Sequence, residues 1–266
     1  MEQVRNERPW FTRHTLLRVP EITVLFWVIK GLSTAMGESV SDYLVHAINP
    51  VVAVSGTFVA FVVTLVIQFS RQRYDAWTYW FTVVMVGVFG TMAADVFHVV
   101  LKVPYTASTI FYGLILAAVF VAWRLVEKTL SIHSIDSPLR EAFYWAAVAA
   151  TFAMGTALGD LTAYTLHLGY FVSAAVFAGA IAAPAIGFRS LRWNAVFSFW
   201  FAYVMTRPLG ASIADGLGKP RSVSGLGVGD GAVSIACGIL IFVLVAYLAR
   251  TKSDVQTPAG RPDPRS

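Results

Sequence analysis

The sequence predicts an all-α integral membrane protein with eight transmembrane helices, built as four parallel two-helix repeats with both termini in the cytoplasm. Three observations predict this class. Of the 266 residues, 57% are hydrophobic and 13% are charged, against about 25% charged residues in a soluble domain. Apolar runs of about 20 residues, each long enough to cross a bilayer, fill most of the chain. A spaced four-residue pattern recurs four times along it.

The repeated pattern is a Trp, a Gly ten residues later, a small residue four positions after that Gly, and then an Asp. Its four copies begin at Trp27, Trp80, Trp145 and Trp200, contain Gly37, Gly90, Gly155 and Gly210, and end at Asp42, Asp95, Asp160 and Asp215. The chain has only eight Trp residues, so four matching copies define an internal repeat.

The expected elements follow in chain order. A basic segment, residues 1–20, lies on the cytoplasmic membrane surface. A single transmembrane domain covers residues 21–250, and residues 251–266 form a disordered tail. The spans are expected at about 21–45, 50–70, 76–100, 105–125, 141–166, 169–188, 194–216 and 229–250, which gives repeats at about 21–70, 76–125, 141–188 and 194–250.

The basic residues set the orientation. Most Lys and Arg residues fall on the side that holds both termini, whereas the loops of the other side hold Lys102, Lys219 and Arg221. The positive-inside rule therefore places both termini in the cytoplasm. The net charge of +5 comes from these flanking segments, so the expected partner is the lipid bilayer and no nucleic acid. On the outer side, the Gly-rich loop from Gly216 to Gly231 is the best candidate for a mobile element.

This pattern resembles a bacterial membrane-protein family described as a repeat of unknown function (347), with four tandem repeats of two transmembrane regions and one Trp each. The resemblance covers about residues 21–250. It implies the fold and a place in the bacterial cytoplasmic (inner) membrane, and it implies no substrate.

The repeated Gly and the small residue four positions later allow close contact between membrane helices. The odd-numbered helices should therefore form the inside of the bundle, with the even-numbered helices around them. Each repeated Trp lies about six residues into its helix. We expect these residues to anchor the helices at the cytoplasmic interface as an aromatic belt, with stacking on a cation as the alternative.

The four repeated Asp residues lie near the outer helix ends. Ionisable groups in membrane helices usually face the interior and mark a functional path, so we expect the four carboxylates to converge around the bundle axis. Alternatively, each one binds its own loop or pairs with His46, His98 or Lys219. These two histidines and His167 do not repeat in position, which favours an interfacial role over a transition-metal site.

Other polar residues break the symmetry. The first repeat adds Lys30, Thr34 and Glu38, with Glu38 and Asp42 one helical turn apart. At the offset of Glu38 the second and third repeats have Thr91 and Thr156, and the fourth places Arg207 at the offset of Thr34. Excess acid within the spans predicts a partly hydrated acidic cavity, with Arg207 and Lys30 as counter-charges of Glu38. An ion pair between Arg207 and Glu38 is the structural alternative.

We therefore expect a secondary transporter of a small cation or cationic solute, with proton coupling because buried carboxylates can titrate near neutrality. Its only expected cofactor is a bound cation, a proton or a metal ion. The candidate binding residues are Asp42, Asp95, Asp160, Asp215, Glu38, Arg207, Lys30, Thr34, Thr91 and Thr156. A non-transporting scaffold or sensor with internal ion pairs is the alternative. An enzyme is not expected, because no nucleophile and base share a motif.

Overall fold

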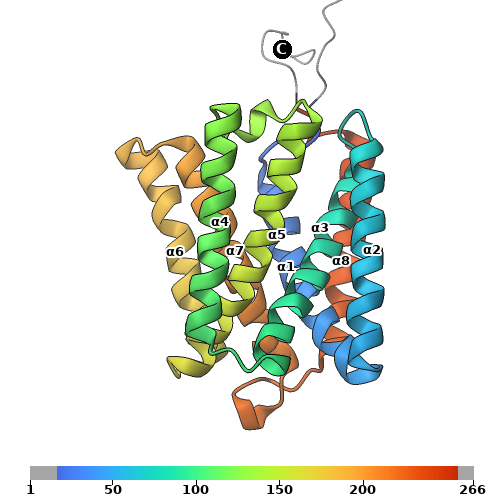
Figure 1. Cartoon of the computed structure of the whole chain (residues 1–266), viewed down its shortest axis with the longest axis vertical. Coiled ribbons are helices and arrows are strands. Elements are labelled where there is room, and N and C mark those ends of the chain that lie inside the picture. The colour runs from blue at the N-terminus through green and yellow to red at the C-terminus, as the bar shows by residue number, and fades with distance from the viewer. Residues whose placement is uncertain (1–16, 257–266) are drawn as a thin grey trace, which may run out of the picture.

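The computed structural model describes residues 17–256, and this part of the chain is helical without strands. Its long helices run side by side along the molecule (Figure 1). They are α1 (Val24–Ala47), α2 (Pro50–Ser70), α3 (Ala76–Asp95), α4 (Tyr105–Glu127), α5 (Pro138–Asp160), α6 (Gly169–Leu191), α7 (Ala195–Gly218) and α8 (Asp230–Thr251). The expected all-α class and the expected helix positions are confirmed.

Six of these helices, all except α1 and α7, are long and apolar enough to cross a membrane. This property is typical of a multi-pass membrane protein. The two remaining helices contain most of the charged residues of the candidate site, among them Lys30 and Glu38 on α1 and Arg207 on α7. The charged residues of the candidate site therefore lower the mean hydropathy of α1 and α7.

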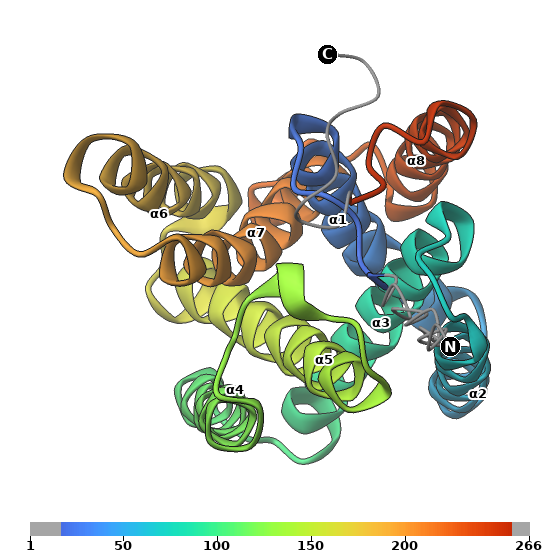
Figure 2. The same ribbon diagram turned by 90° about the horizontal axis from the view of Figure 1, so that it is seen from above.

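The helices form two layers around one axis. Seen from above, α1, α3, α5 and α7 occupy the inside and α2, α4, α6 and α8 lie around them (Figure 2). Each inner helix contacts the next one, and α7 closes the ring on α1. The outer helices pack mainly on the following repeat, with α2 on α3, α4 on α5, α6 on α7 and α8 back on α1. The inner helix of each repeat is thus covered by the outer helix of the repeat before it, and the contact of α8 with α1 closes the ring.

Small residues allow this close packing. A Cβ atom added at Gly37 would lie 2.9 Å from the carbonyl carbon of Gly87, where α1 meets α3. One added at Gly210 would lie 1.9 Å from Thr34 Oγ1, and one at Gly155 would lie 2.4 Å from Cγ of Arg207. The predicted role of the repeated glycines in contacts between inner helices is confirmed at these positions.

Two inner helices change conformation directly after the repeated Asp. Helix α3 continues as a π-helical turn, η1 (Val96–Val100), and α5 as another, η3 (Leu161–Thr165). We expected ordinary helix there. Single π turns are rare and frequently occur at functional sites. Asp95 and Asp160 therefore share a local backbone environment that the first and fourth repeats lack.

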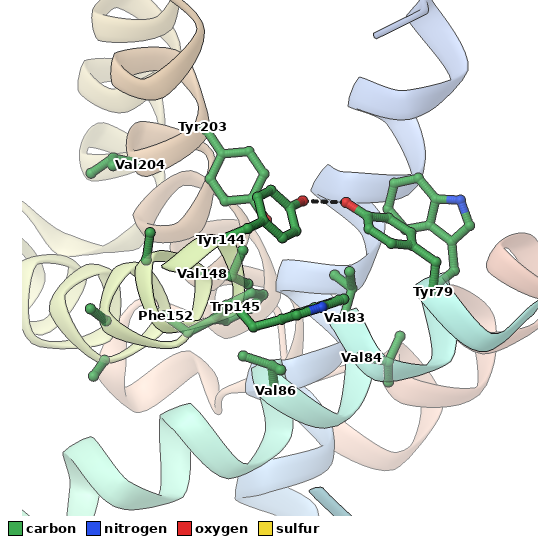
Figure 3. Close-up of a cluster of buried hydrophobic side chains, with 14 of the residues drawn as sticks. Tyr79, Val83, Val84, Val86, Tyr144, Trp145, Val148, Phe152, Tyr203 and Val204 are labelled. Carbon is green, nitrogen blue, oxygen red and sulfur yellow. Dashed lines mark hydrogen bonds between the residues drawn. The ribbon is translucent and has the colours of Figure 1, made fainter. Parts of the chain in front are cut away.

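The repeated Trp residues do not form the expected aromatic belt. Trp80, Trp145 and Trp200 are only 1%, 3% and 5% exposed, so this interpretation is wrong for three of the four repeats. They pack among tyrosines that extend the same inner face. Figure 3 shows the rings of Tyr79 and Tyr144 joined by a hydrogen bond between their hydroxyl groups. The side chains of these three Trp residues are thus part of the hydrophobic core.

Both described ends of the chain pack against the bundle. Val19 is buried, and Arg18 Nη1 donates a 2.6 Å hydrogen bond to Glu141 Oε2. Asp254 is 2% exposed and accepts a backbone hydrogen bond from Glu21. Residues 17–20 and 251–256 thus lie against the bundle and against each other, and the expected surface segment and tail stay predictions. The remainder of both segments, 1–16 and 257–266, lies outside the described residues.

Candidate functional site

Arg207 is fully buried at the centre of the inner ring. Its Nη2 atom lies 2.6 Å from Glu38 Oε2 and 2.7 Å from Thr156 Oγ1, and it also hydrogen-bonds Thr91 Oγ1. Its Nη1 atom donates a 3.4 Å hydrogen bond to the carbonyl oxygen of Thr34. The guanidinium on α7 is therefore held by one residue or more from each of α1, α3 and α5.

The repeat explains this convergence. Glu38, Thr91 and Thr156 all follow their Trp by 11 residues, and Arg207 follows its Trp by seven. Positions four residues apart lie on one helix face, so the four side chains meet at neighbouring levels of the ring. The ion pair between Arg207 and Glu38, predicted as the structural alternative, is confirmed, and the two side chains are 0% and 5% exposed.

Lys30 lies near Arg207 but has different surroundings. Its Nζ atom is 4.1 Å from the centroid of the Phe152 ring and 4.3 Å from that of Tyr203. Lys30 is fully buried, and within residues 17–256 its Nζ has no hydrogen-bond partner. The prediction that Lys30 neutralises Glu38 is wrong, because the ammonium lies between aromatic faces instead. Phe152 also contacts the guanidinium of Arg207, at 5.3 Å, so one ring serves both cations.

The acidic part of the site begins at Glu38. Carboxylate oxygens of Glu38, Asp42 and Asp215 all lie within 4.8 Å of one another. Lys219 Nζ forms an ion pair with Asp42 and lies 4.0 Å from Asp215 Oδ1. Of the predicted alternative pairs, that between Lys219 and a repeated Asp is thus confirmed for Asp42. Ser41, on the same helix, is fully buried and its hydroxyl has no partner in the described structure.

Asp95 and Asp160 belong to the same region. Asp95 is close enough to interact electrostatically with Glu38 and Asp160, and Asp160 interacts in the same way with Glu38 and Asp42. Both are partly exposed, and neither carboxylate takes part in a hydrogen bond or ion pair recorded for residues 17–256. The four repeated carboxylates thus gather at one end of the inner ring, and only those of the first and fourth repeats contact Lys219.

The ammonium group of Lys219, which lies just outside the helices, links two of the carboxylates at this end of the inner ring. Lys219 follows the last residue of α7, and although burial lowers its pKa, Asp42 and Asp215 raise the pKa overall. Gly227 donates a 2.9 Å hydrogen bond to the carbonyl oxygen of Lys219, and Leu226 one of 2.8 Å to that of Gly216. The loop after α7 is therefore tied back onto the end of its own helix.

The hydrogen-bond contacts of His46 and His98 are with backbone carbonyl oxygens and one hydroxyl group. His98 Nδ1 is 3.1 Å from the carbonyl oxygen of Val103, and its Nε2 is 3.2 Å from Ser108 Oγ. His46 Nδ1 contacts the backbone oxygen of Asp42 at 2.6 Å. Both ring nitrogens of His98 are thus occupied, which favours the interfacial role over metal binding.

The predicted acidic cavity stays a prediction, because the cavities of ≈ 600, ≈ 430 and ≈ 380 Å³ lie elsewhere in the part of the chain that the structure describes. They are lined by other, mainly apolar residues. The carboxylates instead gather where the inner helices end. The charged side chains of Lys30, Arg207, Glu38 and Asp42 therefore follow one another along the inner ring.

Sequence reasoning missed the two aromatic residues that contact Lys30. Phe152 has the same offset from its Trp as Arg207, and Tyr203 has the same offset as Lys30. Comparison of these offsets across the repeats would have found both residues. Sequence reasoning also missed Glu141. This residue is fully buried and accepts a 2.8 Å hydrogen bond from Gln68 Nε2 in addition to its pair with Arg18.

The fold and the site together define a helical protein with a fourfold internal repeat, a charged centre and six helices that are apolar enough to cross a membrane. The chain belongs to the family described as Repeat of Unknown Function (DUF347), whose sequence profile matches at residues 25–74, 78–129, 143–190 and 198–254. Each match covers one inner helix and the outer helix that follows it, and the expected resemblance is confirmed. No curated protein and no solved structure matches the chain.

Proposed function

We propose that the protein is a secondary transporter of a small cation or cationic solute in the bacterial cytoplasmic membrane, with eight spans and both termini in the cytoplasm. One observation carries the proposal: oxygens of Glu38, Asp42 and Asp215 lie within 4.8 Å of one another. Oxygen ligands at such spacing suit a hard cation. The unpartnered hydroxyl of buried Ser41 adds a further donor atom on the same helix.

Binding in this scheme is an exchange of cations. The ammonium of Lys219 already neutralises Asp42 and lies 4.0 Å from Asp215. An incoming cation takes its place and frees the loop after α7, while Arg207 keeps Glu38 oriented. Protons can serve in the same exchange, because adjacent carboxylates share them readily. A coupled proton would thus move opposite to the solute.

A scaffold or sensor is the second candidate, and a specific observation favours it. Arg207 pairs with Glu38 and Lys219 with Asp42, so internal residues neutralise two of the acids. In that case the pairs fix the register of α1 against α7 and nothing passes between them.

Flux measurements separate the two candidates. The purified protein is reconstituted in vesicles containing a pH-sensitive dye, and alkali, divalent and tetraalkylammonium cations are added in turn. We expect at least one cation to change the internal pH, and Asp42→Asn and Asp215→Asn to abolish that signal. Glu21→Gln is the matched control, because Glu21 lies near His133 at the other end of the bundle. A silent wild type across the whole panel, or a signal equal in all variants, would favour the scaffold.

A further inference from the structure

A groove of ≈ 600 Å³ lies apart from the carboxylates, between α4 and the start of α7. Its volume falls in the range of about 300–1,000 Å³ that is typical of ligand pockets. The groove is lined by Phe120, Arg124, Lys128, Thr129, Leu130, Asn194, Val196, Phe197, Trp200, Phe201, Val204 and Met205. It thus combines a long apolar wall with two cations.

The two cations lie at one end of the groove. Arg124 is in the last turn of α4 and Lys128 caps this helix, and both side chains are exposed. Asn194, which caps α7, lines the same end. From there α7 extends past Phe197 and Phe201, so the groove becomes apolar with distance from the helix ends.

The positive charge at this end is uncompensated. No acidic residue lines the groove in the described structure. The nearest acids along the chain are engaged elsewhere, because Glu127 and Asp136 lie 2.6 and 3.1 Å from nitrogens of Arg140. Arg192, in the turn before α7, is exposed and adds to the charge.

We propose that this groove binds an anionic phospholipid, with its phosphate on Arg124 and Lys128 and one acyl chain along α7. Basic pockets between membrane helices favour acidic lipid headgroups. The α7 residues that line the groove run from Asn194 to Met205, which corresponds to about 16 Å of helix. This length equals about half of the roughly 30 Å hydrocarbon core, as one acyl chain of one leaflet requires. The site is independent of the proposed cation path.

Native mass spectrometry of the detergent-solubilised full chain tests the proposal. Phosphatidylglycerol and phosphatidylcholine of identical acyl chains are titrated separately, and glycerol phosphate is added as a competitor without chains. We expect phosphatidylglycerol to bind with higher affinity than phosphatidylcholine, and Arg124→Gln/Lys128→Gln to weaken it by roughly tenfold or more. Glycerol phosphate should not displace it, because most of the groove is apolar.

Arg71→Gln/Arg73→Gln is the matched control, since both residues are exposed and follow α2. It should keep the wild-type affinity. Equal binding of the two lipids, or equal loss in both double variants, would overturn the proposal. A Phe201→Ala variant tests the apolar wall and should release phosphatidylglycerol faster. A dimer that Arg124→Gln/Lys128→Gln dissociates in the absence of lipid would assign the groove to a second copy instead.

Discussion

Arg207 on α7 and Glu38 on α1 form a 2.6 Å ion pair in which both side chains are buried. The two helices belong to the last and the first repeat, so this pair lies at the point where the ring closes. Removing two charges from water is unfavourable by several kcal/mol per ion, and only good geometry with additional hydrogen bonds offsets this. The two Thr hydroxyl groups and the Thr34 carbonyl near Arg207 provide such bonds.

Replacing one partner of this ion pair should lower the free energy of unfolding more than replacing both partners. We expect Arg207→Gln to lower the free energy of unfolding by about 3–5 kcal/mol, because it leaves Glu38 buried without a counter-charge. The double variant Glu38→Gln/Arg207→Gln should recover part of that loss. Denaturant unfolding in detergent, analysed as a double-mutant cycle, measures the coupling. Strictly additive effects would show that the two residues do not interact.

The buried ammonium of Lys30 should destabilise the fold. Its contacts with Phe152 and Tyr203 are worth about 2 kcal/mol when desolvated, whereas removal of the charge from water costs several. We expect Lys30→Met, which keeps the length of the side chain, to raise the free energy of unfolding by about 1–3 kcal/mol. The unfolding midpoint in detergent measures this change. A clear fall would mean that the aromatic contacts outweigh desolvation.

The glycine contact between α1 and α3 should not tolerate a methyl group. A Cβ at Gly37 would lie 2.9 Å from the backbone of Gly87, which cannot move away as a flexible side chain can. We expect Gly37→Ala to lower the unfolding free energy by about 1–3 kcal/mol. Gly113→Ala on α4 is the control, because nothing lies within 4 Å of a Cβ atom added there. This change should raise the free energy of unfolding by about 0.5–1 kcal/mol. Similar effects of both changes would refute the close contact.

Asp75, before the first residue of α3, should make stability depend on pH. Burial opposes ionisation, but hydrogen bonds from the Thr78 N–H and hydroxyl lower the pKa of Asp75 overall. A depressed pKa contributes stability above the unfolded value of about 3.9, and that contribution is lost as the pH falls through the folded pKa. Unfolding of wild type and Asp75→Asn at several pH values should differ above about pH 4 and converge below it. If the difference in stability between the two proteins grew as the pH fell, the pKa of Asp75 would be raised by folding and the prediction would be wrong.

Much of the architecture could be predicted because it depends on spacing. Apolar length locates the helices, and the interval between Trp and Asp identifies the inner ones. The pair of Arg207 with Glu38 was also within reach, because both offsets place the side chains on the face that carries the Trp. Each of these features depends on spacing along a helix, so local geometry is sufficient to predict it.

Features that depend on packing between repeats could not be predicted. Trp80 packs against Phe26 of α1, and Trp200 packs against Phe120 and Trp123 of α4, so their depth follows from contacts with other repeats. The π turns after Asp95 and Asp160 have no marker in composition. Lys30 lies between rings from α5 and α7, and the order of helices around the axis decides this placement.

The central claim is that Glu38, Asp42 and Asp215 form a cation site, and a thermal unfolding titration tests it most directly. The unfolding midpoint of purified protein is measured against alkali, divalent and tetraalkylammonium cations for wild type, Asp215→Asn and Glu21→Gln. Ligand at 100 times its dissociation constant stabilises a protein by about 2.7 kcal/mol. We predict that at least one cation raises the midpoint of wild type and Glu21→Gln and leaves that of Asp215→Asn unchanged. A midpoint that no cation raises, or that rises equally in all three proteins, would contradict the account.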